Sequence, residues 1–500
     1  MMYILKVMKN RMHILFAVIV TAFALGGCSA NPATGKQSFT GFMSPEKEIA
    51  VGAEEHPKMV KQFGGLYEDR ALSIYVRELG LSLAKVSEKP DLPWKFTVLN
   101  DTMVNAFALP GGYVYVTRGL LALASDKAEL AGVLSHEIGH VTARHSAQRY
   151  SSTVAANIGV QVIGVLSQVA GLGRVGGDLA SLGANAALKG YSRDQELESD
   201  MLGVRYMTLL GYDPNALISF FEKLRAHQKI EAIKAGKSAD AADQTSIFAT
   251  HPRTADRITQ AIDLAQKNGG QKPKRDADNY LNTIDGLVFG DDAKEGLIRG
   301  QAFIHPDLRV RFEVPEGFTL KNNPDVVLAT DKSGAIIKFA MASPKEVQDA
   351  GGMENFLVKK WSSNLTLEKV EWLDINGLKA VTGEASVWSG LSTMTVRRVL
   401  VERDQNTYWR LQFEVPPKER ERLNEPLRKT TYSLREPTAK ELSTAKSWRV
   451  RVIKVGPNVT YQNLVNSMAV KDMKAEWFEA LNNLNPDSSL HQGQRVKVIK

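Results

Sequence analysis

The sequence predicts a multidomain α+β protein in three folded parts. These are a mainly helical domain with a small sheet, an α+β domain with an antiparallel sheet, and a small βααβ module. At 500 residues the chain is too long for one ordinary domain. Helical spacing of apolar residues dominates residues 45–270, and short strand patterns dominate residues 295–440. With 43% hydrophobic and 24% charged residues, the composition is that of globular protein.

Charge and cysteine content exclude several kinds of function. The formal net charge is +8, and three of the basic residues precede the only cysteine, Cys28. Such a modest excess, without a recognisable nucleic-acid-binding module, does not indicate a nucleic-acid partner. A single cysteine permits no intramolecular disulfide, and its place near the N-terminus makes it a poor candidate for a metal ligand.

Residues 1–27 resemble a lipoprotein signal peptide. A basic start precedes the apolar run Ile14–Leu25, which is short for a bilayer span but typical of a signal-peptide core. The run ends at Leu25-Gly26-Gly27-Cys28, which resembles a bacterial lipobox with Cys28 lipidated; the alternative is an ordinary secretory signal with an incidental cysteine. Ser29, by resemblance to Gram-negative lipoproteins, implies a periplasmic protein anchored at the outer membrane. Residues 28–44 are predicted to be a tether.

Periodicity predicts the elements of the first domain. We expect helices at 45–63 and 68–85, a strand at 95–99, two strands about a Pro-Gly-Gly turn within 105–116, and helices at 129–148 and 192–210. Polar residues interrupt the apolar stretch 151–170, so we interpret it as a buried helix and not as a membrane span. Residues 171–190 contain a formal GxGxxG, but it follows a helix; we therefore expect no nucleotide, and a loop beside a cleft that can act as a lid.

The helix at 129–148 contains the motif His136-Glu137-Ile138-Gly139-His140, or HExxH. On a helix, residues four apart project from the same face, so His136 and His140 can offer two nitrogens to one zinc ion. Glu137 lies one step around the helix. It can reach a water at the metal without ligating the metal, as a general base must.

A catalytic zinc needs a third protein ligand, and two candidates are present. His145 does not fit the extended HExxHxxGxxH spacing, and we expect it to be a surface or hydrogen-bonded histidine. Glu196 and Asp200 lie four apart at the start of the helix at 192–210 and share a face, whereas Glu198 points roughly 200° away. We assign Glu196 as the ligand and Asp200 as the acceptor of a histidine N–H.

Four segments in order resemble the M48 metallopeptidases, zinc endopeptidases of the gluzincin type. They are Asn105 to Gly112, His136 to Val141, Ser192 to Asp200, and Thr250 to Ile258. The resemblance covers residues 45–270 and implies a zincin-type metalloprotease domain with one Zn²⁺ per chain. It departs mildly at Ser199, where alanine is usual, and we expect this side chain to face away from the metal. Clear membrane helices like those of the family's prenyl proteases are absent, so their prenylated substrates are not implied.

The resemblance implies a role for each matching residue. His136, His140 and Glu196 would hold the zinc, and Glu137 would be the general base for hydrolysis of a peptide bond. The segment Asn105, Ala106, Phe107 and Ala108 can act as an edge strand that pairs with an extended substrate, or it can be a purely structural hairpin. His251 can approach the zinc as a fourth ligand or a regulator, or it can simply precede a helix.

The rest of the chain contains no catalytic constellation. Residues 271–294 are predicted to be a linker, and residues 295–440 an α+β domain of unknown role with a mostly antiparallel sheet. Residues 445–500 have the βααβ order of a LysM module, which they resemble. That resemblance implies contact with peptidoglycan through 447–500; a purely structural cap is the alternative.

These observations lead to one functional hypothesis and one rival. The first is a zinc endopeptidase that cleaves unfolded or misassembled cell-envelope proteins. The rival is a non-catalytic or chaperone-like lipoprotein that binds unfolded proteins or peptidoglycan. The complete set of His136, Glu137, His140 and Glu196 favours the enzyme.

Overall fold

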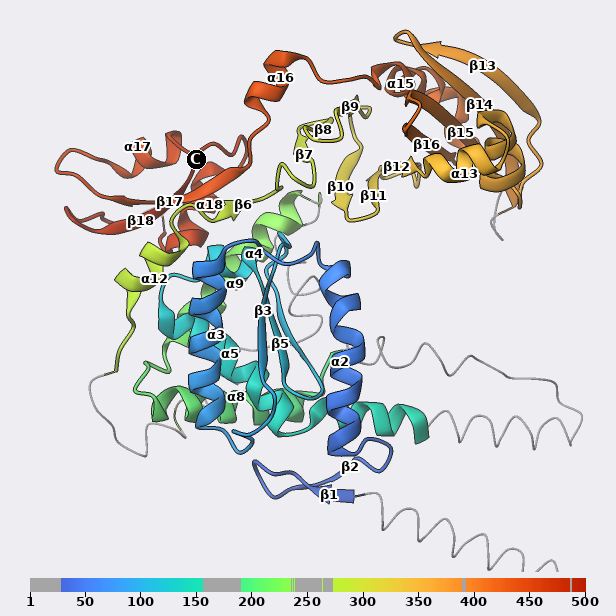
Figure 1. Cartoon of the computed structure of the whole chain (residues 1–500). Helices are drawn as coiled ribbons and strands as arrows, with labels where there is room; N and C mark the ends of the chain where they lie inside the picture. The colour runs from blue at the N-terminus through green and yellow to red at the C-terminus, as the bar shows by residue number, and fades with distance from the viewer. Residues whose placement is uncertain are drawn as a thin grey trace, which may run out of the picture. The chain divides into compact units, whose positions relative to one another are not determined.

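The computed structural model describes residues 28–155, 190–234, 273–388, 393–485 and 488–500, together with Gly236, Ser238 and Asp263. The chain forms two compact units. Unit 1 comprises Met1–Leu287 and Val450–Lys500, and unit 2 comprises Val288–Arg449 (Figure 1). The protein is therefore a multidomain α+β protein, as the sequence predicts. The signal peptide at 1–27, the lid loop before residue 190, and His251 lie outside the described residues.

A small mixed sheet lies at the centre of unit 1. Strand β5 (Tyr113–Thr117) pairs in parallel with β3 (Lys95–Leu99) and antiparallel with β4 (Ala106–Leu109), so β4 is an edge strand. The Pro-Gly-Gly turn joins β4 to β5. Gly111 has a φ of +81°, and a Cβ there would lie 2.6 Å from the Cα of Ile49, so only glycine fits this approach to the neighbouring helix.

Helices surround this sheet, and several begin at side-chain caps. Besides helical residues 145–155 and the C-terminal segment, the helices of unit 1 include, in chain order, α2 (Pro45–Gln62), α3 (Arg70–Lys85), α4 (Arg118–Leu123), α5 (Lys127–Thr142), α8 (Arg193–Leu209), α9 (Ala216–Lys234) and α12 (Ala277–Ile284). Asp126 caps α5, and Ser192 with Gln195 forms a capping box on α8. Helix α3 packs on β3, and α5 packs on β4 and α8. Helix α5 is buried on nearly every side, which places the HExxH motif in the core.

Two predictions about the protein's local structure are wrong. The expected tether at 28–44 forms a hairpin of β1 (Cys28–Ala30) and β2 (Gln37–Phe39) and continues toward α2. Its residue Asn31 is buried, because its side chain bonds into the domain. The single helix expected at 129–148 is interrupted: α5 ends at Thr142, Arg144 adopts a left-handed conformation with a φ of +58°, and helical residues resume at 145.

The C-terminal segment belongs to unit 1. It has the predicted order of β17 (Trp448–Lys454), α17 (Tyr461–Asn466), α18 (Lys474–Asn482) and β18 (Arg495–Ile499), with β17 and β18 antiparallel. The side-chain nitrogen of buried Lys497 donates to carbonyls at the end of α4, those of Ala122, Leu123 and Ala124 (2.6–2.9 Å). These hydrogen bonds to the last carbonyls of a helix join the C-terminal segment to the rest of unit 1. Its identity as a LysM module stays a prediction.

Unit 2 is built around an antiparallel sheet of seven strands. Across the sheet the strands are β10 (Thr319–Asn323), β11 (Val326–Thr330), β12 (Ile336–Ala342), β16 (Thr407–Val415), β15 (Thr393–Asp404), β14 (Leu378–Trp388) and β13 (Lys369–Ile375). The apolar core of the sheet includes Trp409, Phe339 and Phe413, and helix α15 (Arg420–Ser433) contributes Leu423 to it. The expected antiparallel sheet is therefore present.

The smaller elements of unit 2 precede the sheet, lie between its strands or follow it in sequence. They are β6 (Val288–Phe289), the small sheet of β7 (Leu297–Arg299), β8 (Ala302–His305) and β9 (Val310–Glu313), then α13 (Pro344–Asp349), α14 (Met353–Asn355), η3 (Phe356–Trp361), η4 (Pro417–Glu419) and α16 (Ala439–Thr444). The segment 271–294, predicted to be a linker, contains α12 and β6. Among the described residues of the whole chain, no helix has both the length and the apolarity needed to cross a bilayer.

Candidate metal centre

The site is formed where α5 and α8 cross closely. Glycine makes this approach possible on both helices: a Cβ on Gly139 would lie 2.7 Å from the hydroxyl of Ser199, and one on Gly203 would lie 3.1 Å from the backbone nitrogen of His136. Ser199 is fully buried against α5, and its hydroxyl donates to the carbonyl of His136. The serine that departs from the family pattern therefore joins the two helices that carry the site.

Among the described residues, one group of histidine and carboxylate side chains is arranged to share a metal ion: His136, His140 and Glu196. All three are buried. The Nε2 atoms of the two histidines are 2.9 Å apart. The Glu196 carboxylate lies 3.6 Å from Nε2 of His136 and 3.3 Å from Nε2 of His140.

The outer ring nitrogens of both histidines are occupied by hydrogen bonds. Nδ1 of His136 is 2.8 Å from the Asp200 carboxylate, and Nδ1 of His140 is 2.8 Å from Nδ1 of His145. If each Nδ1 carries the ring's proton, both Nε2 atoms present lone pairs to one another and to a carboxylate. Such an arrangement repels unless a cation lies within it.

Two imidazole nitrogens and one carboxylate oxygen are a donor set that zinc prefers. Burial holds the pKa of His140 well below its usual range, which keeps the imidazole in the neutral form that binds metal. The residues present therefore fit a zinc ion. Glu137 is also fully buried on α5, one residue beyond the first histidine.

Tyr191 and Arg149 form a cover over one side of the site. The Tyr191 ring stacks on the His140 ring, with centroids 3.7 Å apart and planes at 15°, and the guanidinium of Arg149 lies 3.8 Å from the centre of the Tyr191 ring. The Tyr191 hydroxyl bonds with that of Ser146 at 3.1 Å. Burial raises the pKa of this phenol, so it stays neutral.

Sequence reasoning gave no role to Glu198. His145 is buried and hydrogen-bonded, and its Nε2 lies 3.3 Å from the Glu198 carboxylate. Burial would raise the pKa of Glu198, but hydrogen bonds from His145 and then Thr34 outweigh it and lower the pKa. The spacing of His145 excludes direct ligation in the extended motif. Only the break at Arg144, which the sequence pattern does not reveal, turns His145 back toward His140.

The other predicted site residues are those of the edge strand and Cys28, which are described below, and His251, which lies outside the described residues. Asn105 precedes the edge strand β4, which contains Ala106, Phe107 and Ala108, and all four are buried. Phe107 packs between Phe63 and Tyr115 in a small aromatic cluster. Cys28 is the first residue of β1.

Comparison with known proteins shows what part of the chain is similar to. Residues 71–265 match the model of Peptidase family M48. The putative beta-barrel assembly-enhancing protease of Vibrio cholerae is 30% identical over 229 residues, which are 44% of this chain and 45% of that protein. The mitochondrial metalloendopeptidase OMA1 of Schizosaccharomyces pombe is 31% identical over 43% of this chain and 59% of its own length. Metalloprotease YcaL of Escherichia coli is 27% identical over 51% of this chain and 98% of its length.

The match covers only part of the first of these relatives. The chain spans about half the length of the beta-barrel assembly-enhancing proteases it matches, between 45% and 48% for those of Vibrio cholerae and Escherichia coli. The second unit, Val288–Arg449, lies beyond the segment that the family model covers.

Proposed function

We propose that this protein, whose residues 71–265 match the model of Peptidase family M48, is a zinc-dependent endopeptidase. One observation carries the proposal: two buried imidazoles and one buried carboxylate are grouped around a common point, with Glu137 on the same helix as the histidines. In this proposal His136, His140 and Glu196 hold one Zn²⁺, which leaves an open position for water.

Zinc would supply Lewis acidity, which makes water a competent nucleophile near neutral pH and polarises the peptide carbonyl. Glu137 acts as general base: its carboxylate accepts the proton of the attacking water and delivers it to the leaving amine nitrogen. Asp200 accepts the N–H of His136, which fixes that ring's tautomer and aims its Nε2 at the site. Because the Tyr191 ring stacks on the His140 ring, rotation of the His140 ring is restricted.

The substrate would bind as an extended chain along β4. This strand is paired by β5 on one side only and packs on the helix that carries the motif. An extended peptide can add to such an edge through backbone hydrogen bonds, which do not depend on its sequence. That mode of binding suits unfolded polypeptides, so Asn105 to Ala108 are the proposed substrate-binding residues.

We further propose that these substrates are unfolded or misassembled proteins of the cell envelope. The support is the name of the Vibrio cholerae relative, a putative beta-barrel assembly-enhancing protease, together with the lipobox-like sequence that ends at Cys28. Lipidation of Cys28 would hold the protein at the outer membrane on the periplasmic side. Contact of residues 447–500 with peptidoglycan and control of the site by His251 are subsidiary proposals, and both rest on sequence resemblance alone.

Cleavage of an unfolded protein such as casein tests the proposal. The wild-type chain and Glu137→Gln are compared at equal zinc content, because the substitution removes the base and leaves the three ligands in place. We expect the cleavage rate of the variant to fall by about 10²–10⁴-fold. Equal cleavage by both proteins would contradict the mechanism. No cleavage by either, with zinc bound, would favour the rival function, a lipoprotein that binds unfolded proteins without cleaving them.

A further inference from the structure

A directed chain of hydrogen bonds leads away from the second histidine of the motif. When Nε2 of His140 binds a metal ion, the proton of the neutral ring must be on Nδ1. That nitrogen then donates to Nδ1 of His145 at 2.8 Å. His145 then accepts at Nδ1 and carries its own proton on Nε2. That nitrogen lies 3.3 Å from the Glu198 carboxylate, which can accept it.

The chain ends on the tip of the N-terminal hairpin. The second oxygen of the Glu198 carboxylate accepts from the side-chain amide of Asn31 and from the hydroxyl of Thr34, both at 2.6 Å. The side-chain oxygen of Asn31 also accepts from the backbone of Ala33 at 2.9 Å, which fixes the side chain in a tight turn. Gly35 completes the turn with a φ of +70°.

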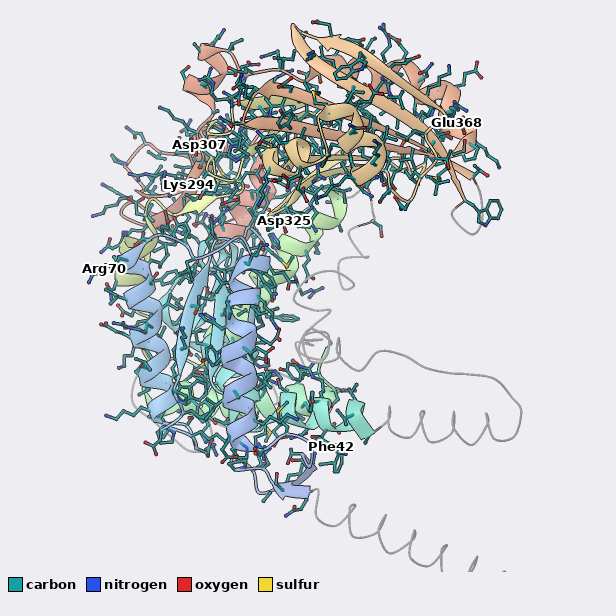
Figure 2. The ribbon with its side chains drawn as sticks, turned by 45° about the vertical axis from the view of Figure 1, so that its right-hand side comes forward. Phe42, Arg70, Lys294, Asp307, Asp325 and Glu368 are labelled. Atoms are coloured by element: carbon teal, nitrogen blue, oxygen red, sulfur yellow. The ribbon has the colours of Figure 1, made fainter. Side chains whose placement is uncertain are left out.

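The hairpin is held in place independently of Glu198. Arg144, at the break after α5, is buried, and its guanidinium donates to the Ser29 hydroxyl (3.1 Å) and to the carbonyl of Met43 (2.6 Å). Its Nε faces the Glu48 carboxylate at 3.2 Å. The backbone N–H of Phe42, labelled in Figure 2, donates to the Ser151 hydroxyl at 3.2 Å. The hairpin tip is therefore a fixed support and not a loose end.

We propose that the hairpin β1–β2 is a working part of the metal centre, in which Asn31 and Thr34 hold Glu198, and Glu198 with His145 positions His140. These four are positioning residues, since they reach the site only through the His140 ring. The inference rests on the proposed zinc site. It means that the segment beginning at Cys28 supports a metal ligand, so any anchor at Cys28 is joined to the active centre by a short, ordered element.

The affinity for zinc, measured by competition with a chelator of known affinity in the full-length chain, tests this. Glu198→Gln keeps the shape of the side chain, but only one of its two terminal atoms can still accept a hydrogen bond. The variant therefore loses either the bond from His145 or the bonds from the hairpin residues Asn31 and Thr34. We expect the Kd for zinc to rise about tenfold. The matched control is Asp194→Asn, which removes an exposed carboxylate from the same helix and should leave the Kd unchanged.

A second set of variants tests the hairpin itself. Asn31→Ala combined with Thr34→Val should raise the Kd for zinc by about threefold or more, whereas Ser38→Ala, on the same hairpin, should not. When the two hairpin substitutions are combined with Glu198→Gln, the affinity for zinc should fall little further, because all three substitutions interrupt the same chain of hydrogen bonds. His145→Gln, which can still accept and donate, should bind zinc more tightly than His145→Leu. Urea unfolding of the metal-free proteins reports separately whether each variant folds.

The outcomes distinguish this inference from the proposed function. Wild-type binding of zinc with unchanged affinity in Glu198→Gln and in the hairpin double variant would overturn the inference and leave the zinc enzyme intact. A wild-type chain that binds no zinc would overturn both. The metal-free variants could also lose unfolding free energy. A loss equal to the whole loss in zinc-binding free energy would show that the hairpin stabilises only the fold, which also rejects the inference.

Discussion

Two buried carboxylates lie near opposite ends of helix α5, Glu129 in its first turn and Glu196 beside the histidines near its end, and their surroundings differ. Near the start of the helix, both oxygens of Glu129 lie 2.7 Å from the ammonium of Lys223, and the Ser219 hydroxyl and the Ser125 backbone N–H also donate, each at 2.8 Å. Near its end, Glu196 lies 3.3 Å and 3.6 Å from the Nε2 atoms of two histidines. One carboxylate lies beside a lysine side chain, and the other is grouped with two imidazoles.

The contrast separates a structural cluster from a metal site. A buried carboxylate needs a compensating positive charge. The Glu129 cluster contains that charge: the positive charge of Lys223, and then its hydrogen bonds, outweigh the effect of burial and lower the pKa of Glu129. At Glu196 the neighbouring imidazoles are turned so that their Nδ1 atoms meet other acceptors. A zinc ion bound by His136, His140 and Glu196 would supply positive charge at this end of the helix. The predictions below test this difference.

The largest effect on stability is expected at the structural end. Lys223→Met leaves Glu129 buried without its ammonium partner, and breaking a buried ion pair typically costs about 3–5 kcal/mol. Urea unfolding should show this loss, with no change in zinc affinity for the folded protein. Lys229→Met, at an exposed position on the same helix, should change the unfolding free energy by less than about 0.5 kcal/mol. A loss of bound zinc in Lys223→Met would contradict the distinction between a structural cluster at Glu129 and a metal site at Glu196.

A smaller effect is expected at the metal end. Asp200→Asn removes the charge that faces Nδ1 of His136, so the ring is a weaker base and its tautomer is less strictly fixed. The Kd for zinc should rise by about 10–100-fold, which corresponds to about 1.4–2.7 kcal/mol. Chelator competition measures it. Unchanged affinity would mean that Asp200 does not support the ligand.

The smallest effect is expected at the rim of the structural cluster. Arg275 contacts Asp126 at 2.8 Å and Glu129 at 3.4 Å, but a third of its side chain is exposed to solvent (34%). Arg275→Gln should lower the unfolding free energy by about 1 kcal/mol or less, because solvent screens the pair. A loss as large as that of Lys223→Met would show that Arg275, and not Lys223, compensates the buried charge.

Local signals in the sequence predicted much of this structure. The strand at 95–99 and the helices that carry HExxH and Glu196 follow from periodicity and caps over a few residues. The grouping of His136, His140 and Glu196 follows from helical spacing and from chemistry that zinc imposes on its ligands.

The errors concern contacts between residues far apart in sequence. Residues 28–44 have the composition of a tether, yet Asn31 finds its partner at Glu198, 167 residues away. The left-handed Arg144 is stabilised by Glu48 and Met43, so the helix pattern around it could not reveal the break. Lys497 likewise joins the C-terminal segment to α4 across 373 residues or more. Periodicity and propensity carry no information about such pairs.

The zinc content of the purified chain tests the central claim most directly. Wild type and Glu196→Ala are dialysed side by side against metal-free buffer, and zinc is measured per mole of protein. The account predicts one zinc per wild-type chain and almost none in the variant, because two histidines alone leave the site without its charged ligand. A wild-type chain without zinc, or a variant that retains it fully, would contradict the account.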